Sequence, residues 1–306
     1  MASADPSTIA YLRDSYRPLA ECQVPINLHA FQYGTGCFEG IRGYWDGERI
    51  NVLFMREHFE RLAGNARLLH MHSPSVEDMC EIAQELVRQN RCQQNIYFRP
   101  MVFKDGLELG PVLHRMDDGY LCYIIPLGDY LDTSKGLDLC VSSWTRLSDN
   151  TIPTRAKATG GYLNSALAKS EALMNGYDEA LMLNSRGQVA EGSAENLFLV
   201  RDGALVTPDL ASDILEGITR FAVIELANLL GIPVVERPVG RTELYRTDEA
   251  FLCGTGCQVS WVRSIDRRVV SDTRGPITER IQKLYEDAVY GRDPRFAHWL
   301  TPVPVS

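Results

Sequence analysis

The stretch Arg155-Ala156-Lys157-Ala158-Thr159-Gly160-Gly161-Tyr162 places a lysine among small residues, with no acidic side chain next to it. The chain has only five lysines. Desolvation and nearby cations lower the pKa of an amine, and a neutral amine is a nucleophile that can form a Schiff base with an aldehyde. Most lysines are solvated surface residues, so a chemical role for Lys157 depends on the residues that accompany it.

Further segments supply groups that pyridoxal phosphate needs from a protein. Tyr162 stands five residues after Lys157, and Glu191 lies within Val189–Asn196. A carboxylate at the ring nitrogen of this cofactor keeps that nitrogen protonated, so that the ring can accept electrons. The segment Leu215–Arg220 places a glycine and a hydroxyl at the start of a predicted helix, which presents backbone N–H groups to a phosphate. Each signal is common by itself, and only the combination indicates the cofactor.

Composition narrows the class of protein. The chain has 306 residues, of which 45% are hydrophobic and 23% charged, as is typical of globular proteins of one large or two smaller domains. A net charge of −9 argues against nucleic acid as a partner. The longest apolar stretch, Leu121–Leu127, is too short to span a membrane. Met1–Thr8 lacks the features of a signal peptide, so we expect a cytoplasmic protein. The scattered cysteines predict no metal site.

Hydrophobic periodicity predicts helices and strands throughout the chain. Helices are expected at 59–69, 79–87, 162–175, 219–230 and 277–291, and strands at 96–103, 121–127, 137–144, 180–183, 196–200, 204–206, 251–253 and 259–263. Hairpin signals between the short strands favour a mixed α/β or α+β architecture over a doubly wound parallel sheet. The polar, glycine-bounded stretch 128–136 is the best linker candidate. It divides the chain into a small N-terminal α/β domain, 1–127, and a large C-terminal α/β domain, 137–306.

Taken in order, these motifs resemble a known enzyme family. R-A-K-A-x-G-G-Y, A-E-G-S-x-E-N-L-F, L-E-G-I-T-R and F-L-C-G-T-G resemble the fold-type IV pyridoxal phosphate enzymes, specifically the branched-chain amino acid aminotransferases. The N-terminal half resembles them through Tyr33–Arg42, Arg56-Glu57-His58 and Tyr97–Pro100. The resemblance extends from about residue 27 to about residue 290. Several ordered motifs together are specific where each alone is not.

The resemblance implies a role for each motif residue in binding the cofactor. Lys157 would be the internal aldimine lysine and the base that moves the proton between the substrate and the cofactor. Tyr162 would donate to the ring oxygen, and Glu191 would pair with the ring nitrogen. The phosphate would be bound by an arginine and by a cup of backbone and hydroxyl donors, namely Arg56, Gly217, Ile218, Thr219 and Thr255.

The resemblance also implies which residues bind the substrate. Phe38, Gly40 and Arg42 would bind the substrate, and Phe38 and Gly40 would line its apolar side-chain pocket. Arg99, helped by Tyr97 and Tyr33, would bind the distal carboxylate of glutamate. The α-carboxylate would receive backbone N–H groups, and a further tyrosine would come from the linker; these residues are Gly256, Cys257 and Tyr130.

The implied protein has the two-domain fold-type IV architecture, with the cofactor in the cleft between the domains. Its implied activity is transamination between L-leucine, L-isoleucine or L-valine and 2-oxoglutarate in branched-chain amino acid biosynthesis. At least a homodimer is implied, because the family completes its pocket with residues of a neighbouring chain. Two departures leave the substrate range open: Leu127 replaces a frequent aromatic, and Leu109-Gly110-Pro111 replaces a more usual loop.

Three alternatives stay open at this point. A D-amino acid or (R)-amine aminotransferase shares the fold, the lysine and the glutamate. An aminodeoxychorismate lyase would eliminate pyruvate and would not need Arg99 for glutamate. A phosphate-binding module without enzymatic activity would explain the turn at Gly217–Thr219 but would leave Lys157 and Glu191 without a purpose.

Overall fold

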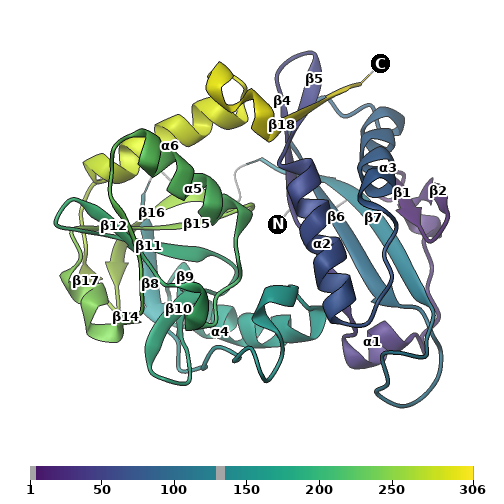
Figure 1. Ribbon diagram of the computed structural model, residues 1–306, viewed down its shortest axis with the longest axis horizontal. Coiled ribbons are helices and arrows are strands. Elements are labelled where there is room, and N and C mark those ends of the chain that lie inside the picture. The colour runs from purple at the N-terminus through teal and green to yellow at the C-terminus, as the bar shows by residue number, and fades with distance from the viewer. Residues whose placement is uncertain (1–4, 129–134, 306) are drawn as a thin grey trace. The chain divides into compact units, whose positions relative to one another are not determined.

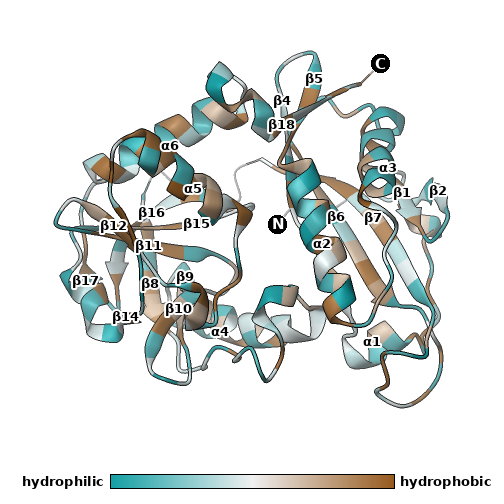
Figure 2. Cartoon of the chain, in the orientation of Figure 1, coloured by the Kyte–Doolittle hydropathy of each residue, from teal (hydrophilic) through white to brown (hydrophobic). Residues whose placement is uncertain are grey.

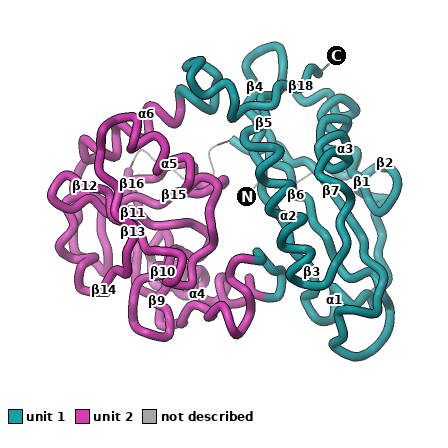
Figure 3. The backbone as a smooth tube through the Cα atoms, viewed as in Figure 1, with its two compact units in different colours: residues 1–128, 156–160, 287–306 teal, residues 129–155, 161–286 magenta. Residues whose placement is uncertain are grey.

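The computed structural model describes residues 5–128 and 135–305, so the expected pocket residue Tyr130 lies outside the described residues. The chain forms two compact units (Figure 3). Unit 1 comprises residues 1–128, 156–160 and 287–306, and unit 2 comprises residues 129–155 and 161–286. No helix in the described ranges is long and apolar enough to cross a membrane.

Unit 1 is built around one sheet, which has eight strands among the described residues. The strand order is β18-β5-β4-β6-β7-β1-β2 (Figure 1). Strand β3 lies outside this order and pairs with β6. Its strands are β1 (Ile9–Leu12), β2 (Ser15–Pro18), β3 (Gly36–Phe38), β4 (Ile41–Trp45), β5 (Arg49–Leu53), β6 (Ile96–Lys104), β7 (Asp118–Pro126) and β18 (Leu300–Pro304). Its helices are α1 (His29–Tyr33), α2 (Met55–Leu68) and α3 (Val76–Gln89), with 3-10 helices at Leu19–Glu21 and Pro294–Trp299.

Strand β6 alternates as the sequence predicts. Ile96, Phe98 and Val102 are buried in the core that α2 and α3 share with the sheet. Tyr97 and Arg99 lie half-buried on the opposite face of the strand, because successive side chains of a strand point to opposite sides. The alternation therefore keeps two polar side chains out of the core and side by side.

Unit 2 contains a sheet of ten strands among the described residues, in the order β13-β12-β11-β15-β16-β8-β9-β10-β14, with β17 paired to β16. Its strands are β8 (Leu137–Val141), β9 (Glu179–Leu183), β10 (Gln188–Gly192), β11 (Asn196–Arg201), β12 (Ala204–Thr207), β13 (Val234–Glu236), β14 (Val239–Gly240), β15 (Glu249–Gly254), β16 (Gln258–Ile265) and β17 (Arg268–Val269). Its helices are α4 (Tyr162–Met174) and α5 (Ile218–Leu229), and α6 (Pro276–Val289) runs on into unit 1. The remaining 3-10 helices are Thr154–Ala156, Thr159–Gly161, Leu210–Ser212 and Arg241–Arg246.

Most strand pairs are antiparallel, and the parallel pairs are β8 with β9, β8 with β16 and β12 with β13. The mixed α/β prediction is confirmed, and the doubly wound alternative is excluded. Helix α6 carries both hydrophilic and hydrophobic residues (Figure 2) and buries Ile281, Tyr285 and Ala288. Its first turn is bound by the buried carboxylate of Glu249, which accepts hydrogen bonds from the backbone N–H of Ile277 at 3.1 Å and of Thr278 at 2.8 Å.

Two segments of unit 1 come from the part of the chain that we assigned to the C-terminal domain. Strand β18 pairs antiparallel with β5, from Leu300 opposite Leu53 to Pro304 opposite Arg49. Residues 156–160 bind the strand β3 region through the backbone, since the N–H of Gly160 donates to the carbonyl of Gly34 at 3.0 Å. Hydrophobic periodicity describes local elements and does not report such long-range pairings.

Gly34→Ala is expected to lower stability more than the control Gly187→Ala. Both glycines have positive φ, +66° and +73°, so both alanines carry the left-handed penalty of roughly 1–2 kcal/mol. An added Cβ at Gly34 would lie 2.9 Å from Gly160 Cα, whereas at Gly187 it meets no described atom within 4 Å. Overpacking should therefore add on the order of 1–3 kcal/mol at Gly34 alone. Equal urea midpoints for the two variants would contradict the close contact.

Candidate active site

Lys157 lies on a short segment that is bound to the end of strand β3. Ala158 forms an isolated antiparallel bridge with Cys37, and the N–H of Phe38 donates to the carbonyl of Lys157 at 3.3 Å. The hydroxyl of Thr159 donates to the carbonyl of Gly34 at 2.6 Å. Lys157 has a φ of +45°, a conformation that persists in a non-glycine residue only where the surroundings hold it. The small residues around the lysine thus serve close packing of two backbone segments.

Lys157 and Arg99 share one aromatic ring. The Lys157 Nζ atom is 5.3 Å from the ring centroid of Phe38, and the Arg99 Cζ atom is 4.4 Å from the same centroid. Both distances are within the range of cation–π attraction. Arg99 Nη2 also donates a hydrogen bond of 2.8 Å to the hydroxyl of Tyr97. The structure therefore brings the predicted cofactor lysine and the predicted carboxylate-binding arginine together within unit 1.

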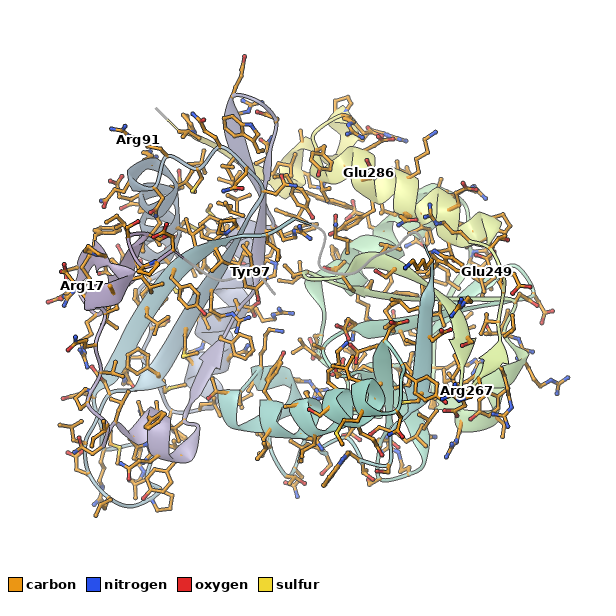
Figure 4. All side chains as sticks on the ribbon, turned by 180° about the vertical axis from the view of Figure 1, so that it is seen from behind. Arg17, Arg91, Tyr97, Glu249, Arg267 and Glu286 are labelled. Carbon is orange, nitrogen blue, oxygen red and sulfur yellow. The ribbon has the colours of Figure 1, made fainter. Side chains whose placement is uncertain are left out.

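Gly40 is required by the position of Tyr97, which is labelled in Figure 4. An added Cβ at Gly40 would lie 2.1 Å from the Tyr97 hydroxyl oxygen.

Tyr33, another predicted substrate residue, is 40% exposed, and its hydroxyl accepts from the N–H of Gly110 at 3.3 Å.

Arg42 was predicted to bind the substrate, and in the structure its side chain binds two backbone carbonyls. It is buried, and its Nη2 donates to the carbonyls of Leu127 at 3.0 Å and Gly128 at 2.6 Å. A guanidinium placed in this way fixes the end of the N-terminal segment of unit 1. Its binding of substrate stays a prediction.

Arg56, the predicted phosphate arginine, lies on the exposed surface of helix α2. Its side chain is 58% exposed on helix α2 and pairs with Glu60 at 3.0 Å and with Glu77 at 2.9 Å. The motif R-E-H identified this arginine from its sequence position alone. An α-helix turns about 100° per residue, so Arg61, five positions on, points from a different face of the same helix.

Arg61 belongs to a buried cluster with Glu39 and His58. Its Nε and Nη2 each donate a 2.7 Å hydrogen bond to Glu39, whose carboxylate is fully buried. His58 Nδ1 lies 2.8 Å from the second oxygen of Glu39. Burial would raise the pKa of Glu39, but the charge of Arg61 and the hydrogen bonds from His58 and Arg61 hold it well below its usual range.

The pKa of His58 connects this cluster with the lysine. Burial lowers the pKa of His58, the hydrogen bond and charge of Glu39 oppose the lowering, and the positive charges of Arg61 and Lys157 add to it. His58 is therefore neutral at neutral pH and donates from Nδ1, because the ionised carboxylate can only accept. The cluster and Lys157 lie close enough for their charges to interact.

In unit 2, Glu191 is a buried carboxylate that is bound on both oxygens. Arg146 Nη2 lies 2.6 Å from Oε1, and Oε2 accepts from Asn196 Nδ2 at 2.8 Å and from the N–H of Leu215 at 3.0 Å. Asn196 also donates to the carbonyl of Leu215 at 3.0 Å. An added Cβ at Gly217 would lie 2.0 Å from the Asn196 side-chain oxygen. One asparagine thus joins the predicted ring-nitrogen partner to the start of helix α5.

The other predicted residues of unit 2 lie at the ends of secondary-structure elements. Gly217 is the N-cap residue of α5, Ile218 begins that helix, and Thr219 is buried in its first turn. Tyr162 begins helix α4 and is half-buried. The turn between β15 and β16 contains Thr255, Gly256 and Cys257.

Glu195 is a second buried carboxyl group close to Glu191 in the sequence. Burial, together with the negative charge of Glu179, raises the pKa of Glu195 to about 8. An added Cβ at Gly192 would lie 2.8 Å from its carboxyl oxygen. Glu191 thus differs from Glu195, because Glu191 has an arginine partner whereas burial shifts the pKa of Glu195 upward.

Sequence reasoning gave no individual role to five residues of these clusters. Glu39, His58 and Asn196 lie inside the quoted motifs. Arg61 follows His58 by three positions on a helix, a spacing that could have placed both on the same face. No local pattern pointed to Arg146.

The sequence and the fold are both similar to those of known proteins. The model of the family Amino-transferase class IV matches residues 36–265. A "Probable branched-chain-amino-acid aminotransferase" of Aquifex aeolicus is 46% identical over 299 residues, which cover 96% of each chain. A branched-chain amino acid aminotransferase of Thermobaculum terrenum, solved in its PLP form, superposes with a TM-score of 0.93 at 39% identity, covering 98% of this chain and 99% of that one.

A third relative was solved with an amino acid. The branched-chain aminotransferase of the thermophilic archaeon Thermoproteus uzoniensis, solved with norvaline, has a TM-score of 0.94 and 41% identity, and the match covers 97% of this chain and 99% of that one. The chain belongs to the class IV aminotransferases and, within them, to the branched-chain-amino-acid aminotransferase family. The family and the two-unit fold-type IV architecture that the sequence predicted are confirmed.

Arg146→Met is expected to destabilise the protein by on the order of 3 kcal/mol, because it leaves the Glu191 carboxylate buried without its charge partner. The exposed fractions of the two side chains are only 11% and 5%. Adding Glu191→Gln should recover most of the loss, since the remaining amide is neutral. Urea unfolding of both single variants and the double variant measures the coupling. Additive effects would show that the ion pair does not matter for stability.

Proposed function

We propose that the protein transfers amino groups between L-branched-chain amino acids and 2-oxoglutarate with pyridoxal phosphate as its cofactor. One observation carries the proposal: the Lys157 amine and the Arg99 guanidinium face the same Phe38 ring. A cofactor lysine beside an arginine that can bind a carboxylate suits a reaction in which one of the two substrates is a dicarboxylate. Amino acids and 2-oxo acids are the substrate class that the family implies.

The residues of this chain fit the cofactor chemically. Pyridoxal phosphate, when bound, supplies an aldehyde for the exchange of amino groups and a ring that accepts electrons. Lys157 provides the amine, and the buried carboxylate of Glu191 provides the partner for a protonated ring nitrogen. The N-terminus of α5, with Gly217, Ile218 and Thr219, provides backbone N–H groups for an anion. Tyr162 and Thr255 provide hydroxyl donors.

We assign the arginine that binds the phosphate to position 61. Arg61 is only 16% exposed and lies in the cluster whose charges reach Lys157. Arg56 is 58% exposed, so that solvent surrounds its guanidinium. A partly buried guanidinium interacts with a phosphate more strongly than a solvated one, because solvent screens the latter.

The residues of the chain have separate roles in the reaction. With the cofactor bound, the Lys157 amine would act as the general base that takes the proton from the α-carbon of the substrate, and its ammonium form would then be the general acid. Backbone N–H groups of Gly256 and Cys257 bind the α-carboxylate. Phe38 contacts the apolar side chain of leucine, isoleucine or valine, and Arg99, with Tyr97 and Tyr33, binds the distal carboxylate of glutamate.

One cavity must accept both leucine and glutamate, and the position of Arg99 accounts for this. An arginine that is fully buried would oppose an apolar side chain, because the unpaired charge would lie in a dry pocket. Arg99 is half-buried and rests on two aromatic rings, at 4.4 Å from the centroid of Phe38 and 5.2 Å from that of Tyr97. These rings stabilise its charge when the substrate carries none.

A panel of amino donors tests the proposed function against its alternatives. A coupled assay with 2-oxoglutarate should give high turnover with L-leucine and L-valine and little with D-alanine or an (R)-arylamine. A preference for D-alanine or the arylamine would identify another aminotransferase of the same fold. Release of pyruvate from aminodeoxychorismate would identify the lyase.

We also propose that the protein is at least a homodimer, in the cytoplasm, with a role in branched-chain amino acid biosynthesis. In unit 1 the helix α1 is bound to the 106–112 loop, because His29 hydrogen-bonds to Gly106 and Gly110. Large apolar side chains are exposed on and beside these two segments, namely Ile26 at 89%, Phe31 at 74% and Leu109 at 83%. Exposed apolar side chains gathered in one region are typical of association surfaces. Sedimentation that shows a fully active monomer would contradict the dimer.

Lys157→Ala is expected to abolish turnover with the fold retained. Other lysines are engaged elsewhere: Lys104 donates to the carbonyl of His70 at 2.7 Å, and Lys169 pairs with Glu179 at 2.6 Å. Lys283→Ala, at an exposed position of α6, is the control and should keep full activity. Amino-transfer assays together with far-ultraviolet circular dichroism check both outcomes. Normal turnover of Lys157→Ala would show that another amine carries the chemistry.

Arg99→Ala is expected to weaken glutamate and 2-oxoglutarate far more than leucine and its keto acid. Loss of a charge-assisted contact to a carboxylate should lower specificity by roughly 10- to 150-fold, whereas leucine should change only a few-fold. Tyr97→Phe removes one hydrogen bond from Arg99 and should produce a smaller shift in the same direction. Single-turnover spectra of each half-reaction measure the two effects. Equal losses for both substrates would assign Arg99 to the α-carboxylate or to the fold.

A further inference from the structure

Glu39 is a fully buried carboxylate for which the proposed reaction has no direct use. It lies between β3 and β4, and its N–H donates to the carbonyl of Pro100 at 3.0 Å, so its backbone is fixed to the central strand β6. Burying a charged group costs several kcal/mol unless partners compensate it. Here Arg61 supplies two hydrogen bonds and His58 a third. Such a costly group persists where it holds something in place.

The geometry shows what Glu39 holds. Two nitrogens of the Arg61 guanidinium donate to the two oxygens of one carboxylate, which is the bidentate arrangement that fixes both the position and the plane of the group. His58 prevents the carboxylate from rotating, because it donates to the same oxygen that accepts from Arg61 Nη2. Arg61 comes from helix α2 and Glu39 from the connection between β3 and β4, so the contact also fixes the helix against these strands.

We propose that Glu39, assisted by His58, is a positioning residue that orients Arg61 for the phosphate of the cofactor. The inference rests on the proposed function, in which Arg61 binds that phosphate. A guanidinium fixed before binding loses less conformational freedom when the anion arrives, and pre-organisation of this kind raises affinity. Glu39 touches neither the reacting atoms nor the substrate in this scheme.

Charge alone predicts the opposite effect, which makes the inference testable. Removing the negative charge of Glu39 leaves a more positive site, and a more positive site attracts phosphate more strongly. Positioning predicts that the phosphate is bound less strongly in spite of the added charge. The direction of the change in affinity therefore decides between the two.

The experiment compares pyridoxal 5'-phosphate with pyridoxal, which lacks the phosphate. The full chain is stripped of cofactor and titrated with each compound, and the ratio of the two affinities isolates the contribution of the phosphate. Glu39→Gln should lower this ratio by about tenfold or more, the loss expected for a charge-assisted contact that is no longer held in place. The affinity for pyridoxal should stay within a few-fold of that of the unmodified protein.

Three further variants make the result specific. Arg61→Ala removes the guanidinium and gives the largest decrease in the ratio, against which the other variants are compared. Arg56→Ala, at the exposed position of the same helix, should leave the ratio unchanged. Glu39→Asp keeps the charge but shortens the side chain, so the ratio should fall by a smaller factor. If Glu39→Gln does not fold, as judged by circular dichroism, Glu39→Asp decides the question, and an unchanged ratio in it overturns the inference.

The outcomes separate this inference from the proposed function. A lowered ratio in both Glu39→Gln and Arg61→Ala supports positioning. A lowered ratio in Arg61→Ala with an unchanged or raised ratio in Glu39→Gln overturns the inference and leaves the assignment of Arg61 intact. An unchanged ratio in Arg61→Ala overturns the assignment of Arg61 and the inference with it, while transamination remains testable by the donor panel.

Discussion

The candidate site depends on the close approach of two glycines, Gly34 and Gly160. Their backbones meet at a distance that leaves no space for a side chain on Gly34, and this contact fixes the segment 156–160 against the start of strand β3. Once the segment is fixed, the Lys157 amine lies over the ring of Phe38, although the lysine itself must adopt a left-handed backbone conformation. The strain at Lys157 is compensated by the hydrogen bonds on either side of it.

One buried carboxylate in each unit is stabilised against the cost of desolvation by the same kind of contacts. Glu39 and Glu191 each form an ion pair with an arginine, Arg61 and Arg146 respectively, and each accepts a hydrogen bond from a further side chain. A buried charge that lacks such partners would be protonated, as the raised pKa of Glu195 illustrates. The arginine partners therefore compensate the cost of burying these two carboxyl groups.

The helices and the longer strands could be predicted from the sequence, because their apolar periodicity is local. Strand β6 is the clearest case, since its alternation also predicted that Tyr97 and Arg99 share a face. What could not be predicted was which arginine of helix α2 faces inward. That depends on Glu39, which is distant in the sequence, and motif matching selected the exposed Arg56 instead. The burial of Arg42 against Leu127 and Gly128 likewise depends on a pairing more than eighty residues long.

Neither unit is one continuous stretch of chain, and this has a consequence for biosynthesis on the ribosome. Strand β5 is completed on one side by β18, whose residues 300–304 are made about 250 positions later. Until then the nascent sheet presents an unpaired strand, which can join to other chains. The lysine segment reaches its partner strand only after residue 160 has emerged. Translation beyond residue 160 is thus needed before Lys157 can take its place in unit 1. The open edge of strand β5 is covered later, when residues 300–304 have been made.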